Sequence, residues 1–151
     1  EYVELGLATP MPVADFAAAV RAGLPHGFTI TGAMESPGGA LADVLTASRW
    51  RIDLPGRSEH EIAAAIADLE ASPEPVTVSR LTKSGTRAIA VGENWVKAAA
   101  APERLTVTVL TATPTVRPDD IVRALDLGPT GLCTREAQGP LVAGEVADPF
   151  A

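Results

Sequence analysis

Apolar and polar residues alternate in six short stretches of the chain, and this spacing is typical of half-buried β-strands. The stretches are residues 2–8, 28–34, 49–54, 76–81, 87–91 and 105–109. In the third of them, Trp50, Ile52 and Leu54 share one face. The pattern therefore predicts six strands, two of which form a hairpin around Lys83-Ser84-Gly85.

Three other stretches have apolar residues three or four positions apart, which predicts helices. The first covers residues 13–24 and the third begins at Pro118. The second begins after Ser58, which is followed three residues later by Glu61. This spacing is a capping box, in which each side chain satisfies a backbone N–H near the other.

Two parts of the chain lack clear periodicity. Residues 92–102 hold Trp95 and a run of alanines, and they are expected to form an irregular connection. From Thr130 onward, Gly and Pro punctuate the sequence. We therefore expect a single α+β domain over residues 1–129, followed by an irregular tail over residues 130–151.

The element order is β-α-β-β-α-β, followed by extra C-terminal strands and a short helix. This order predicts a ferredoxin-like α/β sandwich, with helices packed on one face of an antiparallel sheet.

Composition narrows the class of protein. The chain has 151 residues and a net charge of −7, with 19 acidic and 12 basic residues. This acidity argues against general nucleic-acid binding, and no DNA partner is expected. No apolar run is long enough to span a membrane. The single cysteine, Cys133, excludes an intrachain disulfide and a cysteine-based zinc site, and a reducing cytoplasm is the expected location.

Motifs that carry catalysis are absent from the sequence. There is no G-x-G-x-x-G stretch, no Walker sequence and no serine in a nucleophile elbow. The two histidines, His26 and His60, have no partners in the pattern of a triad or a metal site. We therefore expect no catalytic, cofactor-binding or metal-binding residue in this chain.

One basic group stands out in the acidic chain. Arg80, Lys83 and Arg87 flank the predicted hairpin turn, and Trp95 and Lys97 follow. A basic hairpin with an aromatic residue is able to grip a phosphate or stack a base. The alternative is a polar hairpin that keeps a sheet edge soluble, with Trp95 covering the core.

Arg117 is a further candidate anion contact. The candidate ligand or RNA contacts are thus Lys83, Arg87, Trp95 and Arg117.

Several segments together resemble the radical-SAM-linked domain family of bacteria. They are Glu1-Tyr2-Val3-Glu4-Leu5, Leu24-Pro25-His26-Gly27-Phe28, Leu45-Thr46-Ala47-Ser48-Arg49-Trp50, Lys83-Ser84-Gly85-Thr86-Arg87 and Val116-Arg117-Pro118-Asp119-Asp120-Ile121-Val122-Arg123-Ala124-Leu125. The resemblance covers about residues 1–127, and the stretch around Arg117-Pro118-Asp119-Asp120 is its most specific part. It implies an accessory role beside a radical S-adenosylmethionine enzyme, or near RNA metabolism, and it supplies no catalytic residues.

The sequence departs from the family in two places. The family has a basic stretch ahead of the position of Glu1, so this chain is expected to be the C-terminal part of such a protein. The family also follows its hairpin with an Asp-x-Arg element, where this chain has residues 88–93 instead. A ligand contact made by that element is not expected here.

Three functions remain open. The favoured one is a non-catalytic accessory or substrate-presenting module that works with a radical-SAM enzyme, which would supply the cysteines of an iron–sulfur cluster. The second is an RNA-binding adaptor in RNA processing or modification. The third is an enzyme whose active site lies in the segment expected ahead of Glu1.

Overall fold

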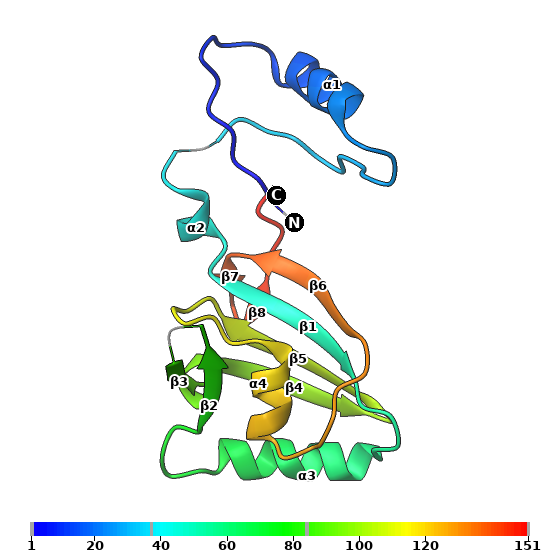
Figure 1. Cartoon of the computed structure of the whole chain (residues 1–151), viewed down its shortest axis with the longest axis vertical. Helices are drawn as coiled ribbons and strands as arrows, with labels where there is room; N and C mark the ends of the chain where they lie inside the picture. The colour runs from blue at the N-terminus through cyan, green and yellow to red at the C-terminus, as the bar shows by residue number, and fades with distance from the viewer. Residues whose placement is uncertain (1, 37, 84, 151) are drawn as a thin grey trace. The chain divides into compact units, whose positions relative to one another are not determined.

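The computed structural model describes residues 2–36, 38–83 and 85–150. The predicted roles of Glu1 and of Ser84 in the hairpin turn lie outside these residues. The chain divides into two compact units. We call residues 2–43 with Phe150 the N-terminal unit, and residues 44–149 the sheet unit (Figure 1).

Among its described residues, 44–83 and 85–149, the sheet unit contains two helices, three antiparallel sheets and one 3₁₀ turn. Its elements are β1 (Ala47–Asp53), α3 (Glu59–Glu70), β2 (Thr77–Thr82), β3 (Gly85–Ala90), the turn Gly92–Asn94, β4 (Trp95–Ala101), β5 (Arg104–Leu110), α4 (Pro118–Ala124), β6 (Cys133–Gly139), β7 (Leu141–Val142) and β8 (Glu145–Val146). The main sheet has the strand order β4-β5-β1-β6, and every neighbouring pair is antiparallel. The β2–β3 and β7–β8 hairpins form separate two-stranded sheets.

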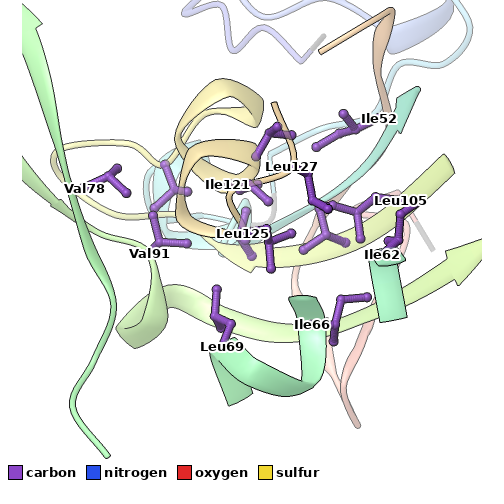
Figure 2. Packing of buried hydrophobic residues seen from close by; sticks show 14 of the residues in the cluster. Ile52, Ile62, Ile66, Leu69, Val78, Val91, Leu105, Ile121, Leu125 and Leu127 are labelled. Atoms are coloured by element: carbon purple, nitrogen blue, oxygen red, sulfur yellow. The ribbon is translucent and has the colours of Figure 1, made fainter. Parts of the chain in front are cut away.

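One hydrophobic core joins the helices to the main sheet. The alternation along β1 and β5 turns Ile52 and Leu105 to the same face, where the register pairs them. Apolar residues of α3 and α4 pack against that face, among them Ile62 and Ile121 (Figure 2). Burial of such a side chain contributes about 1.5–3 kcal/mol, so this face fixes both helices on the sheet.

The β2–β3 hairpin turns one of its faces to the core. Val78 and Ile89 are paired across the hairpin and buried in the core cluster. Alternate residues of a strand point the same way, so the next pair on this inner face is Arg80 with Arg87. The hairpin therefore presents two arginines on this face, of which Arg80 contacts α4 and Arg87 is exposed.

The predicted helices and the hairpin are confirmed, and so is the capping box. Ser58 Oγ accepts from the Glu61 backbone N–H at 3.2 Å, and a Glu61 carboxylate oxygen accepts from the Ser58 backbone N–H at 2.8 Å. A mixed α/β class with antiparallel sheets is likewise confirmed.

In the N-terminal unit, the described residues 2–36 and 38–43 form helices and no strand. It contains α1 (Val13–Gly23), and α2 (Leu41–Val44) leads out of it into the sheet unit. The strands predicted over residues 2–8 and 28–34 are wrong, because the described residues there form no ladder with another strand. A strand exists only where a neighbour takes up its backbone hydrogen bonds, which sequence alternation alone does not guarantee.

Two further predictions are corrected by the structure. Residues 92–102 are not irregular: a 3₁₀ turn leads into β4, whose alanines carry too little side chain to show the alternation of a strand. The tail from residue 130 is not irregular either. Its strand β6 pairs with β1 at the edge of the main sheet, and its sequence is polar because an edge strand is only partly covered.

Candidate functional site

A buried carboxylate lies where the β2–β3 hairpin meets α4. Asp120, in the first turn of α4, is 0% exposed. Its Oδ2 atom accepts the backbone N–H of Arg117 at 3.0 Å, three residues earlier. The same oxygen accepts from Nη1 of Arg80 at 2.5 Å, which brings in a side chain from strand β2. One oxygen of Asp120 thus caps the start of α4 and also holds the hairpin through its ion pair with Arg80.

Arg80 is held in one orientation by these contacts. Its Nη1 donates to Asp120 and also to the backbone carbonyl of Thr115, at 3.1 Å. Its side chain is only 15% exposed. Within the described residues, Nε and Nη2 of Arg80 have no hydrogen bond, and neither is a buried unpaired atom. The guanidinium therefore keeps a fixed pair of donors that solvent can reach.

A second arginine faces the other oxygen of Asp120. Nη1 of Arg123 lies 3.8 Å from Asp120 Oδ1 and donates to the backbone carbonyl of Ser79 at 2.9 Å. Asp120 Oδ1 is buried and has no hydrogen bond among the described residues. The one carboxylate is thus placed between two guanidinium groups, and both arginines tie α4 to strand β2.

Three of the four sequence-predicted contacts belong to the two elements that meet at this carboxylate. Lys83 is exposed at the tip of the hairpin, and Arg87 is exposed on β3 in register with Arg80. Arg117 is exposed at the N-cap of α4. The fold therefore brings separate sequence segments together around Arg80.

Trp95, the fourth predicted contact, lies at the other end of the hairpin. It begins β4, packs against the core, and donates from Nε1 to Glu70 Oε1 at 2.9 Å. The hairpin has six residue pairs between its base, Thr77 with Ala90, and its tip. Arg80 lies three strand steps from that base, or about 10 Å, and the Trp95 indole N–H is already engaged by Glu70 of α3. Trp95 is therefore not part of the group around Arg80.

The residues that the sequence reasoning missed are Asp120 and Arg123. Asp120 lies in the first turn of the helix predicted from Pro118, but the sequence gives no sign that its carboxylate is buried against a strand 40 positions away. The useful signal is its spacing of three from Arg117, which places the carboxylate beside the N-cap backbone N–H. We call Arg80, Lys83, Arg87, Arg117 and Arg123 the arginine cluster.

The charge around the arginine cluster differs from that of the rest of the chain. Residues 75–92, which carry Arg80, Lys83 and Arg87, contain no Asp or Glu, although the whole chain carries a net charge of −7. On α4, Asp119 and Asp120 lie between Arg117 and Arg123. Guanidinium groups stay protonated in proteins and donate hydrogen bonds without releasing protons. The cluster is therefore suited to holding an anion.

Other reactive groups are not brought into this cluster. Partial burial raises the pKa of the Cys133 thiol, and the negative charge of Asp119 raises it further, against a hydrogen bond from Thr130 that lowers it. A thiol in that state is a weak nucleophile at neutral pH.

In the described part of the chain, no group of three or more His, Cys, Asp or Glu residues is arranged to hold a metal ion. None of the helices described is both long enough and apolar enough to cross a membrane.

Residues 1–118 match a protein family described as "Uncharacterized protein conserved in bacteria (DUF2344)". The chain belongs to this family. The match includes Arg80 and Arg117 and ends just before Asp120. Comparison with curated proteins and with solved structures finds no match. The family description names no activity, so a link to radical-SAM enzymes stays a prediction.

Proposed function

We propose that this family member is a non-catalytic accessory module that presents a substrate to a separate enzyme. The observation that carries this proposal is the apolar surface of the N-terminal unit. Val3 is 76% exposed and Phe28 is 69% exposed, and none of the described residues 2–43 is buried. Large apolar side chains exposed in such numbers are typical of surfaces that contact a protein partner.

The arginine cluster supports a binding role over a catalytic one. Its guanidinium groups hold charge without moving protons, and the Asp120 carboxylate beside them is already engaged by Arg80 and by the Arg117 backbone. The resemblance to the radical-SAM-linked family makes a radical-SAM enzyme the proposed partner. The third function given above, in which the chain is part of an enzyme whose active groups lie ahead of Glu1, stays a prediction.

Affinity capture with the tagged chain from cells of the source bacterium tests the accessory role. The variant to compare is Val3→Ser/Leu5→Ser/Phe28→Ser, and the control is Leu81→Ser/Val142→Ser, which removes exposed apolar side chains of the sheet unit. We expect the wild type and the control to recover a radical-SAM enzyme and the triple variant to lose it. Equal recovery by the triple variant, or no such enzyme with the wild type, contradicts the proposal.

A second candidate function is an RNA-binding adaptor, which the arginine cluster favours. Cations gathered on one hairpin and one helix provide local positive charge in spite of the acidic net charge. RNA recovered in the same capture and released by salt would support it. Recovery of the enzyme without RNA would leave the accessory role alone.

We also propose that the sheet unit has a ferredoxin-like arrangement with an insertion. The support is the order β1-α3-β4-β5-α4-β6, together with the antiparallel strand order β4-β5-β1-β6. In this arrangement the β2–β3 hairpin is inserted between α3 and β4, which makes the part that carries Arg80 an addition to a common framework. An experimental structure with another strand order would contradict it.

A further inference from the structure

We infer that Arg80 is the centre of a binding site for a phosphate group of an RNA strand, on the inner face of the β2–β3 hairpin. Arg87 extends this site across the hairpin, and Lys83 adds a cation at the hairpin tip. Arg117 adds another at the N-cap of α4, where its backbone N–H shares Asp120 Oδ2 with Arg80. For the source of the phosphate, the inference rests on the RNA-binding candidate above. The phosphate site itself needs only the geometry around Arg80.

The donors of Arg80 suit a phosphate. Nε and Nη2 lie in one plane on the same edge of the guanidinium, the edge that binds two oxygens of a phosphate or carboxylate side by side. Asp120 and the Thr115 carbonyl use Nη1 only, so they fix the group without covering this edge. An arginine that is already ordered loses less side-chain entropy when an anion binds.

Neighbouring charge favours a ligand with several phosphates. Arg87 is directly opposite Arg80 in the ladder, at a Cα distance of about 5 Å for such pairs. Lys83 is exposed in the turn that follows β2, three residues after Arg80 and within about 10 Å of it along the chain. Charges repeated at this spacing fit a nucleic-acid backbone, which carries one phosphate per nucleotide, better than a single small anion.

The binding test uses the purified full chain and a fluorescent single-stranded RNA oligonucleotide, titrated at several salt concentrations. Arg80→Lys keeps the charge and the possibility of pairing with Asp120 but removes the two-donor edge. We expect it to weaken RNA binding about tenfold, the loss of one charged hydrogen bond. The control Arg104→Gln removes a cation of β5 outside the cluster, and we expect RNA affinity close to that of the wild type.

Loss of Arg80 alone leaves the Asp120 carboxylate buried without its partner, so a second variant protects the fold. Arg80→Gln/Asp120→Asn replaces the ion pair by a neutral pair and keeps the net charge of the chain. We expect this variant to unfold cooperatively, as the wild type does, and to reduce the slope of log K against log salt by about 0.7, which is one phosphate contact on a single strand.

A direct readout is the ¹⁵N–¹H signal of Arg80 Nε during separate titrations with the RNA, a nucleoside diphosphate, pyrophosphate and a poly-glutamate peptide. We expect the RNA to shift this signal at the lowest concentration and the peptide to leave it unchanged. A shift with the diphosphate or pyrophosphate but not with RNA would keep the phosphate site, assign it to a free nucleotide or phosphate, and reject the RNA adaptor.

Two results would overturn the inference. One is no response of Arg80 to any phosphate compound at low salt, or a response to poly-glutamate as strong as that to RNA. The other is wild-type RNA affinity in the folded Arg80→Gln/Asp120→Asn variant. The second result would mean that the chain binds RNA through residues other than Arg80, so the RNA-binding candidate would remain. Neither result bears on whether the N-terminal unit captures an enzyme.

Discussion

Each unit contains a carboxylate that joins segments far apart in the sequence, and the two differ in their surroundings. In the N-terminal unit, Glu4 accepts from Ser36 Oγ and from the Leu41 backbone N–H, both at 3.2 Å, in exposed positions. In the sheet unit, Asp120 accepts from Arg80 and from the Arg117 backbone while fully buried. The hydrogen bonds are equal in number, but water competes for those of Glu4 only.

The same difference holds for the apolar residues of the two units. Val3, Leu5 and Leu7 alternate as clearly as Trp50, Ile52 and Leu54, yet all three are exposed. An amphipathic segment is stabilised when a second layer covers its apolar face. The sheet unit supplies that layer itself through α3 and α4, whereas no described residue of the N-terminal unit is buried.

The largest expected effect comes from removing the buried carboxylate. Asp120→Ala leaves Arg80 unpaired beside the core and should lower the free energy of unfolding by about 3–5 kcal/mol. Glu4→Ala, the matched change in the N-terminal unit, should stay within about 0.5 kcal/mol. Urea denaturation followed by far-UV circular dichroism, which also reports helix α1, measures both. A comparable loss in the two variants would abolish the contrast between the units.

A cavity in the core should cost nearly as much. Ile62→Ala removes a fully buried side chain of α3 and should destabilise the chain by about 2–5 kcal/mol, from lost burial and an unfilled cavity. Phe28→Ala removes a larger side chain that is mostly exposed, and we expect a change within about 0.5 kcal/mol. Thermal unfolding of the two variants checks this. A larger effect of Phe28→Ala would show that the N-terminal unit contributes to the core.

The helix caps give a smaller contrast. Ser58→Ala removes the side-chain acceptor at the start of α3 and should cost about 1 kcal/mol. Helix α1 begins after Pro12, which provides no side-chain cap. Pro12→Ser should therefore raise the amide protection of α1 without changing global unfolding. A global stabilisation by Pro12→Ser would mean that α1 unfolds together with the sheet unit.

The smallest expected effect is on pH dependence. The hydrogen bonds from Ser58, and more weakly Arg57, lower the pKa of Glu61 from its ordinary value of 4.5. A carboxyl with a lowered pKa stabilises the fold above its unfolded-state pKa, and this contribution is lost as the pH falls through the folded-state pKa. An NMR titration of Glu61 should give a midpoint below that measured in Ser58→Ala. Equal midpoints would contradict the role of the cap.

Local features of the chain are predictable from sequence where one short segment contains the whole cause. The capping box needs only Ser58 and Glu61, and the hairpin needs only its two alternating runs and a turn. The sequence pattern does not predict strand β4, because its alanines show no clear alternation. It does not predict β6 either, because an edge strand is partly polar. The strands predicted over residues 2–8 and 28–34 fail because pairing depends on a neighbouring strand.

The candidate site is predictable only in part for the same reason. The sequence points to Lys83, Arg87 and Arg117 as cations in an acidic chain. It does not show that a carboxylate at position 120 fixes Arg80, because that contact crosses 40 residues and depends on how α4 packs against the hairpin.

Amide hydrogen exchange of the full chain, resolved by residue, tests the contrast between the units most directly. Exchange protection reports the free energy of local opening. We expect slow exchange in β1, β5 and α3, with a free energy of opening close to that of global unfolding. In α1 we expect exchange at least 100-fold faster, which corresponds to a free energy of opening roughly 3 kcal/mol lower. Protection of α1 equal to that of α3 would contradict this expectation, since the N-terminal unit would then be as stable as the sheet unit without a partner.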